Sequence, residues 1–335
     1  MPESTFSRRR LLSVLTSSLP LFSIFRSSAQ ADGRQHSTDK IPGSSDGGKP
    51  KVGIALGAGG ANGLAHILML EALDELSIRP HRIAGSSIGA IIGALYAAGM
   101  KGAEIRKLVE QFIVSPKEHV VEELLNKDAL RWVEFLEIDL GDGGLLSSED
   151  FMSFLDDKLK QETFETLEIP LKIVAADLWG REQIVLQSGA LPPAIKASMA
   201  LPGVFQPVEL DGRVLVDGGT VNPVPYDLLT AECDIVIGID VSGERTKPKT
   251  LTPSYFETIF NAVKVMHQAI MTEKLRYKRP AIYLSPHIVD IRALEFYRAQ
   301  EVFIQAGPAK AELKHQLARI IHQGSGICSV AGETV

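Results

Sequence analysis

Short apolar runs alternate along this chain with stretches whose apolar residues recur at helical spacing, and this alternation limits the possible folds more than any other feature. The runs are rich in Val, Ile and Leu, a pattern typical of short strands buried on both faces. Strands that alternate with helices predict an α/β fold with a largely parallel, covered sheet. The predicted strands are Val52–Leu56, Arg82–Gly85, Leu171–Ala176, Ile184–Gln187, Val214–Val216, Ile235–Ile239 and Ala281–Leu284. The predicted helices are Ala61–Leu76, Ile88–Met100, Ala103–Phe112, Ser148–Leu159, Pro193–Ala200, Tyr255–Tyr277 and Ala299–His322.

Composition narrows the class of protein further. Of the 335 residues, 45% are hydrophobic and 23% are charged, an ordinary balance for a globular protein with a sizeable core. The formal net charge is −6, and the body of the chain has no basic cluster with interleaved aromatic residues, so we expect no nucleic-acid partner. The two cysteines, Cys233 and Cys328, exclude a disulfide scaffold and a CxxC-type metal site. Two unpaired thiols are favoured over a single disulfide between them.

The N-terminus has the features of an export signal. Arg8–Arg10 precede an apolar stretch, Leu11–Phe25, which is too short and too rich in serine to span a bilayer, and Ala29–Ala31 offers a small-residue cleavage site. The arginines and the leucines behind them also resemble a twin-arginine signal. We therefore predict a signal peptide over residues 1–31 and an exported protein, either periplasmic or associated with the outer side of the inner membrane. An uncleaved amphipathic membrane anchor is the alternative.

Two further segments are predicted to lie outside the fold. Residues 32–50 are mostly Gly, Ser, Lys and Asp and are predicted to form a flexible linker, and residues 323–335 are predicted to form a loose tail. Loss of residues 1–31 would remove more basic than acidic side chains and leave an even more acidic protein. Long-range charge does not attract such a protein to anionic lipid, so apolar contact must bring it to any membrane.

A G-x-S-x-G sequence, Gly85-Ser86-Ser87-Ile88-Gly89, joins a predicted strand to a predicted helix. On such a strand-to-helix turn the central serine, Ser87, stands clear of the sheet, and glycine is wanted on both sides because a larger residue would clash. The helix that follows points its free N–H groups toward the serine, where they favour a developing negative charge. Ser87 is therefore a candidate nucleophile. The alternative is that Ser87 only caps the helix.

A glycine-rich turn over Gly57–Gly63 joins the first predicted strand to the first predicted helix. A dinucleotide-binding loop does not fit, because Asn62 stands where the third glycine belongs, and a P-loop does not fit because no Gly-Lys-Ser/Thr follows. Small residues would instead let backbone N–H groups approach a reacting carbonyl, as in an oxyanion hole. This loop and the Ser87 turn can lie side by side at the carboxyl ends of the strands. A purely structural tight turn is the alternative.

Asp217 follows the predicted strand Val214–Val216 and precedes Gly218 and Gly219. Asp-Gly most often means only a turn. Next to an exposed serine, however, a carboxylate at a strand end is a candidate base, because a nucleophilic serine needs a proton acceptor within hydrogen-bond reach. Asp217 is therefore the candidate partner of Ser87.

A histidine could complete a triad in the order serine, aspartate, histidine. Ser87 and Asp217 could be joined by His267, His287 or His315. None of these histidines lies in a loop with obvious catalytic character, and His287 at a strand end is the best of them. We favour a dyad without histidine.

Four segments in the same order resemble patatin-like phospholipases, in particular exported bacterial members. They are VGIALGAGGANGLAHILMLEALDEL at Val52–Leu76, IAGSSIGAIIGALYAAG at Ile83–Gly99, KASMALPGVFQPV at Lys196–Val208 and LVDGGTVNPVP at Leu215–Pro225. The resemblance implies a catalytic core over residues 51–243, with residues 244–322 as a helical and strand extension of the same domain. It also implies a three-layer α/β/α fold around the largely parallel sheet.

The resemblance further implies an acyl hydrolase that uses neither a metal nor a cofactor. Ser87 corresponds to the nucleophile and Asp217 to the general base, and the oxyanion hole falls on Ala58, Gly59 and Gly60, with the N–H groups of Gly59 and Gly60 as donors. The remaining glycines of the family motifs are Gly63, Gly85, Gly89, Gly218 and Gly219. The expected substrate is a phospholipid or lysophospholipid, with peripheral membrane contact.

The glycine loop departs from the family pattern at two positions. Ala58 replaces the first glycine and Asn62 replaces a basic residue. Loss of that positive charge weakens the case for a phosphate-bearing head group relative to a simpler lipid ester. Two alternatives to the dyad hydrolase stay open, a Ser-His-Asp esterase or thioesterase and a non-catalytic lipid-binding protein. The apolar helix Tyr255–Tyr277 is better explained by core packing than by an interfacial lid.

Overall fold

The computed structural model describes residues 50–112, 159, 162–246 and 255–326. The chain divides into two units, Met1–Lys40 and Ile41–Val335, and all of the described residues belong to the second. The predicted signal peptide, the linker through residue 49, the predicted helix Ser148–Leu159 except for its last residue, and the tail from residue 327 onward lie outside the described residues. These assignments stay predictions.

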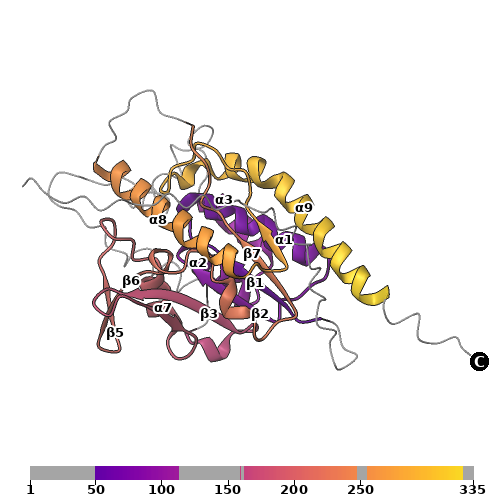
Figure 1. Ribbon diagram of the computed structural model, residues 1–335, viewed down its shortest axis with the longest axis horizontal. Helices are drawn as coiled ribbons and strands as arrows, with labels where there is room; N and C mark the ends of the chain where they lie inside the picture. The colour runs from indigo at the N-terminus through magenta and orange to yellow at the C-terminus, as the bar shows by residue number, and fades with distance from the viewer. Residues whose placement is uncertain (1–49, 113–158, 160–161, 247–254, 327–335) are drawn as a thin grey trace, which may run out of the picture. The chain divides into compact units, whose positions relative to one another are not determined.

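A mixed β-sheet forms the centre of the described fold (Figure 1). Its strands are β1 (Val52–Leu56), β2 (Arg82–Ser86), β3 (Leu171–Asp177), β4 (Glu182–Leu186), β5 (Val208–Leu210), β6 (Arg213–Asp217), β7 (Ile235–Ile239) and β8 (Ile282–Leu284). Through hydrogen-bonded neighbours the strands connect in the order β5-β6-β3-β2-β1-β7-β8, and β4 also pairs with β3. Strands β3, β2, β1, β7 and β8 are parallel neighbours, whereas β4 and β6 pair antiparallel with β3 and β5 pairs antiparallel with β6. The predicted α/β fold with a largely parallel sheet is confirmed.

Helices connect the strands and cover the sheet. The described α-helices are α1 (Ala65–Glu75), α2 (Ile88–Ala97), α3 (Gly102–Phe112), α7 (Leu191–Ser198), α8 (Tyr255–Tyr277) and α9 (Ala299–Gly326). Short 3₁₀ segments are η1 (Gly60–Leu64), η2 (Phe164–Thr166), η3 (Gly218–Thr220), η4 (Tyr226–Leu229) and η5 (Phe296–Arg298).

Several boundaries differ from the predictions. Strand β5 was not predicted, because three residues that include Glu209 carry no apolar run. Helix α2 ends at Ala97 instead of Met100, since Gly99 has a φ of 103° that a helix cannot continue. Helix α9 reaches Gly326, so the predicted loose tail is wrong for its first residues. Each residue added to a formed helix gains one backbone hydrogen bond, which favours extension of α9 beyond His322.

The two faces of the sheet are covered by different helices, as expected for three layers. The face that carries Ile54 and Leu56 belongs to one large apolar core with residues of α1, α2, α3 and α9. The opposite face carries small residues such as Ala55 and Ala84, which pack with Tyr226 of η4 and Met271 of α8. In Figure 1, α8 is drawn in orange and α9 in yellow. Small side chains on this second face let η4 and α8 approach the sheet closely.

Strands β2 and β6 end at consecutive positions on the same edge of β3. Ser86, the last residue of β2, pairs with Val174, and Asp217, the last residue of β6, pairs with Ala175. Strand β4 occupies the opposite edge, since it pairs with Ile173 through Asp177. Because β2 runs parallel to β3 and β6 runs antiparallel to it, the two strands arrive from opposite directions and meet end to end. This junction brings the residue after β2, Ser87, next to Asp217.

Three further features concern membranes, metals and thiols. Among the described residues, no helix is both long enough and apolar enough to cross a membrane. The same part of the chain contains no group of three or more His, Cys, Asp or Glu residues that could hold a metal ion. Cys233 is a free, half-buried thiol, and Cys328 lies outside the described residues.

Candidate active site

Ser87 occupies a strained turn between β2 and α2. Its backbone φ of 55° and ψ of −124° lie in a region that residues other than glycine rarely adopt. Its N–H donates a hydrogen bond of 2.9 Å to the buried hydroxyl oxygen of Ser198, and its carbonyl accepts the N–H of Ala90. The Ser87 side chain makes no cap hydrogen bond to α2, so the helix-capping alternative does not describe it. Ser86 is fully buried, which leaves Ser87 as the half-exposed serine of the motif.

At both glycines of this turn the neighbouring backbone leaves no room for a Cβ, as predicted. A Cβ on Gly85 would lie 2.5 Å from the carbonyl oxygen of Gly89 across the turn, and a Cβ on Gly89 would lie 2.0 Å from the carbonyl oxygen of Leu56. The second clash is with the neighbouring strand instead of the turn itself. For each of the motif glycines a Cβ would come within 3.0 Å of another residue; they are Gly63, Gly85, Gly89, Gly218 and Gly219.

Ser87 and Asp217 are hydrogen-bonded to each other. The Ser87 hydroxyl donates to Oδ2 of Asp217 at 2.6 Å, and the other carboxylate oxygen accepts the N–H of Gly219 at 2.7 Å. Burial raises the pKa of the Asp217 carboxyl to about 6, although the hydrogen bonds from Ser87 and Gly219 act in the opposite direction. The carboxylate is therefore more basic than an exposed aspartate and is oriented by both of its oxygens.

The glycine loop lies beside the Asp217 turn. A Cβ on Gly219 would lie 2.7 Å from Cβ of Ala58, which measures how tightly the two turns pack. The N–H of Ala58 donates to the Pro223 carbonyl at 2.8 Å, so of the three residues predicted for the oxyanion hole, Ala58 has its amide already engaged. Ala58 is not among the residues with positive φ, so alanine causes no backbone strain here.

Gly59 and Gly60 differ from their neighbours. Among the described residues their N–H groups have no hydrogen-bond acceptor, whereas the N–H of Ala61 donates to the Ala293 carbonyl at 2.7 Å. Both glycines are half-buried, while Ala58 and Ala61 on either side are buried. Gly60 has a φ of 59°, and a Cβ on it would lie 2.3 Å from the Ala293 carbonyl oxygen. This part of the loop must therefore be glycine, and it presents unbonded amides.

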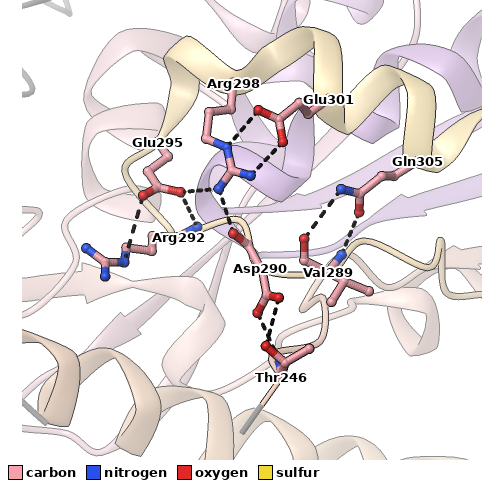
Figure 2. A network of polar contacts seen from close by, with 8 residues as sticks. All are labelled: Thr246, Val289, Asp290, Arg292, Glu295, Arg298, Glu301 and Gln305. Carbon is pink, nitrogen blue, oxygen red and sulfur yellow. Dashed lines mark hydrogen bonds and ion pairs between the residues drawn. The ribbon is translucent and has the colours of Figure 1, made fainter. Parts of the chain in front are cut away.

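The segment around Ala293, which contacts Gly60, is held in place by a network of hydrogen bonds and ion pairs (Figure 2). The Arg298 guanidinium donates to both carboxylate oxygens of Glu301, to Glu295 at 2.9 Å and to the Asp290 carbonyl at 2.6 Å. The Asp290 carboxylate in turn accepts the N–H and the hydroxyl of Thr246. The segment that contains Ala293 is thereby fastened to the start of α9 and to the chain that follows β7.

Lys274 of α8 fastens the loop between the Asp217 turn and η4. Its ammonium group donates to Oδ1 of Asn222 at 2.5 Å, to the Val224 carbonyl at 2.8 Å and to Asp227 at 2.5 Å. It also lies 4.6 Å from the centre of the Tyr226 ring. Together with buried Met271, these contacts confirm core packing for the C-terminal half of α8.

Asn62 points away from solvent. It is buried, its Nδ2 donates to the Ser242 carbonyl at 3.3 Å, and its Oδ1 has no hydrogen-bond partner. The amide therefore packs against the segment that follows β7 instead of extending over Gly59 and Gly60.

No histidine bonds to Ser87 or Asp217 in the described part of the chain. His287 is exposed and faces Glu244 at 3.4 Å, and His315 is exposed on α9. His267 of α8 is buried, and its Nε2 would lie 3.0 Å from a Cβ on Gly219. Burial lowers the pKa of His267 to about 4, so its ring is neutral above that pH.

His66 has a structural contact. It is fully buried at the start of α1, and its Nε2 lies 2.8 Å from the Gly57 carbonyl oxygen. Burial lowers the pKa of His66 to about 4, so the neutral ring donates this hydrogen bond and holds the beginning of the glycine loop.

Sequence reasoning missed Ser198 as a neighbour of the site, and it did not distinguish His267 from the other two candidate histidines. Ser198 lies 111 residues after Ser87 in the chain and shows no local pattern beyond its place in KASMALPGVFQPV. The apolar pattern of Tyr255–Tyr277 revealed the helix, and the face to which His267 belongs depended on how that helix packs.

Comparison with known proteins matches residues 54–230 to the family described as patatin-like phospholipase. An uncharacterized NTE family protein of Mycobacterium tuberculosis is 35% identical over 200 residues, which cover 59% of this chain and 51% of the relative. A patatin-like phospholipase domain-containing protein of Caenorhabditis elegans is 28% identical over 315 residues, which cover 84% of this chain and 22% of the relative. Among solved structures, VipD from Legionella pneumophila aligns with a TM-score of 0.44 at 15% identity, over 79% of this chain and 67% of that chain.

The chain spans about half the length of the mycobacterial relatives that it matches. The family match itself extends over more than half of the present chain. It includes both glycine-bearing turns and Asp217. This protein is a member of the patatin-like phospholipase family.

Proposed function

We propose that this protein is a serine acyl hydrolase that cleaves fatty-acyl esters of phospholipids or lysophospholipids. The hydrogen bond of 2.6 Å between the Ser87 hydroxyl and Oδ2 of Asp217, made on a strained and half-exposed turn, is the observation that carries the proposal. A nucleophilic serine needs a base at this distance, and strain of this kind gathers at functional sites. Membership of the patatin-like phospholipase family supports lipid ester hydrolysis as the general class of reaction.

The proposed reaction has two halves. Oγ of Ser87 attacks the ester carbonyl while its proton passes to Asp217, and the N–H groups of Gly59 and Gly60 donate to the oxyanion that forms. Collapse of this intermediate breaks the bond to the alcohol, which takes the proton from Asp217 and leaves an acyl group on Ser87. Water then attacks the acyl group and gives a proton to Asp217. Collapse of this second intermediate breaks the bond to Oγ of Ser87, which takes the proton back from Asp217, and the fatty acid is released.

The glycine loop supports this role because the residues on both sides of its unbonded amides pack against the turns that carry the dyad. The loop packs on the Asp217 turn at Ala58, and a Cβ on Gly63 would lie 2.2 Å from the Ile88 side chain, at the first residue of α2. The loop is therefore wedged between the two turns that carry Ser87 and Asp217. The loop Gly57–Gly63 contains no Lys or Arg, and the polar side chain of Asn62 is buried and bonded to Ser242. The loop therefore offers no cation to a head group, and we propose that it recognises the acyl ester.

The experiment that tests the proposal is covalent labelling followed by hydrolysis. We expect a fluorophosphonate to add one phosphonyl group to the full chain at Ser87, located by peptide mass spectrometry, and p-nitrophenyl acyl esters and lysophospholipid to be hydrolysed. Pre-labelled protein should be inactive on both. A folded protein that neither reacts with the probe nor turns over any chain length would instead support the non-catalytic lipid-binding alternative.

The pH dependence should report the Asp217 carboxyl. Because the base must be ionised and burial raises its pKa to about 6, kcat/KM should rise up to about pH 6 and stay level above it. The measurement is a pH series on a soluble p-nitrophenyl ester from pH 4.5 to about 8.5. His287→Ala and His267→Gln are the controls and should keep both turnover and the same midpoint. Loss of activity in either variant would point to the Ser-His-Asp alternative.

A further inference from the structure

The turn between β3 and β4 presents a tryptophan to solvent at the same end of the sheet as Ser87. Trp179 is 76% exposed and its neighbour Leu178 is 39% exposed. Single exposed apolar residues are common on protein surfaces, so exposure alone carries little weight. The construction of this turn and its place in the fold are what distinguish it.

The turn is held by a set of hydrogen bonds centred on Asp177. Oδ1 of Asp177 accepts the N–H of Trp179 at 3.0 Å and of Gly180 at 2.9 Å, and its carbonyl accepts the N–H of Arg181 at 2.8 Å. The other carboxylate oxygen receives Arg213 at 2.9 Å. These hydrogen bonds lower the pKa of Asp177, with the N–H of Gly180 as the largest cause, so the carboxylate stays charged. The exposed Trp179 is therefore part of a turn whose backbone is fixed by hydrogen bonds.

The register of the sheet places this turn above the dyad. Asp217 pairs with Ala175, and β3 continues beyond this point to Asp177 before the turn begins. Each strand residue advances by about 3.3 Å, so the start of the turn lies about 7 Å past the level of Asp217. Since β2 runs parallel to β3, Ser87 follows its strand at the same end of the sheet. A surface that met Trp179 would therefore face the end of the sheet where the Ser87 turn lies.

The chemistry of the turn fits a phospholipid–water interface. Tryptophan combines a large apolar body with one N–H donor and is enriched where an apolar phase meets water. Arg181 next to it is exposed and makes no ion pair with another described residue, so it is available to a phosphate group. The chain has a net charge of −6 and is not drawn to anionic surfaces over long distances, which favours a zwitterionic lipid held by apolar contact.

We propose that the β3–β4 turn, Leu178–Arg181, is the surface by which this protein docks on zwitterionic phospholipid, with Trp179 inserted at the level of the head groups. The inference rests on the proposed function, because a lipid surface is where the proposed substrate is found. It adds to that function a defined contact that orients the Ser87 side of the sheet toward the bilayer.

Fluorescence of Trp179 tests docking independently of catalysis. The other tryptophan of the chain, Trp132, is replaced by Phe, and Ser87→Ala prevents hydrolysis, so that the full chain reports only Trp179. On addition of phosphatidylcholine vesicles we expect the emission to shift to the blue and acrylamide quenching to fall. Emission and quenching that stay unchanged at saturating lipid overturn the proposal, whether or not the wild type is a hydrolase.

A matched pair of variants tests the consequence for turnover. Tyr277, at the end of α8, is 93% exposed but precedes β8 and so lies toward the opposite edge of the sheet. Trp179→Ser should lower hydrolysis of vesicle phosphatidylcholine about tenfold or more, the loss expected when one large apolar contact is removed, and should leave a monomeric p-nitrophenyl ester unaffected. Tyr277→Ser should leave both unchanged, and Trp179→Phe should recover part of the vesicle activity. Equal losses on both substrates in Trp179→Ser, or equal vesicle losses in Tyr277→Ser, would overturn docking through this turn.

Discussion

Ser87→Ala is expected to lower kcat for ester hydrolysis by roughly 1000-fold or more while the fold persists. Alanine removes the oxygen that attacks the ester, and no second hydroxyl can take its place because Ser86 is fully buried. Covalent labelling by a fluorophosphonate should disappear in the same variant. Steady-state kinetics on a soluble p-nitrophenyl ester, with circular dichroism to verify folding, make the measurement.

Ser87→Gly separates the chemical role of this residue from its conformation. Both variants lose the nucleophile, but the φ of 55° and ψ of −124° at this position strain any residue with a Cβ. Relief of this strain should make Ser87→Gly more stable than Ser87→Ala by about 1–2 kcal/mol in the free energy of unfolding, measured by urea titration. Equal stability of the two variants would mean that the turn stores no strain. Residual turnover near the wild-type rate in either variant would remove Ser87 from the mechanism.

Asp217→Asn is expected to lower kcat about 100-fold to 10,000-fold, the usual contribution of a general base. Asparagine keeps the shape of the side chain and can still accept the N–H of Gly219, so the turn should persist. It cannot take a proton from Ser87. A comparison of kcat on the same soluble ester measures the loss, and Asp211→Asn, at the exposed turn between β5 and β6, is the matched control that should keep full activity.

The same substitution should stabilise the protein above neutral pH. Burial raises the pKa of the Asp217 carboxyl from the ordinary 3.8 to about 6, so the folded protein holds this proton more tightly than the unfolded chain. In the wild type, this carboxyl therefore contributes its full stabilisation of the folded state below pH 3.8. The free energy of unfolding then falls as the pH rises through 6. Asparagine stays neutral, so Asp217→Asn should match the wild type near pH 4 and exceed it by up to about 3 kcal/mol at pH 8. Thermal unfolding at both pH values tests this, and a variant that is less stable at pH 8 would contradict it.

The sequence was most informative where local chemistry decides the structure. Strands β1 and β7 and helix α8 match their predicted bounds, because an apolar run or a helical period identifies each of them without reference to a neighbour. The pairing of Ser87 with Asp217 could also be predicted, since each lies at the end of a strand in a turn that contains glycine. Strand β5 could not, because its Val-Glu-Leu sequence becomes a strand only by pairing with β6.

Contacts made over long distances in the chain explain the remaining differences. The hydroxyl of Ser198 accepts the N–H of Ser87 only because α7 packs against β3. Nothing in the sequence near either residue predicts this hydrogen bond. Ala58 was expected to belong to the oxyanion hole, but its N–H donates to the Pro223 carbonyl. Such details depend on how separate loops meet at the sheet edge, which a single sequence does not reveal.

The meeting of β2 and β6 on β3 also bears on how this protein can change during evolution. Ser87 and Asp217 are 130 residues apart in the chain, yet Ser86 next to the one and Asp217 itself pair with consecutive residues of β3. An insertion between the elements alters the closure entropy of a loop only slowly with length, and it leaves this alignment untouched. A slip of one residue along β3 would separate the two groups and turn their side chains to opposite faces. The chain between them is therefore free to acquire new substrate-binding segments, whereas the pairing of these three strands is not free to drift.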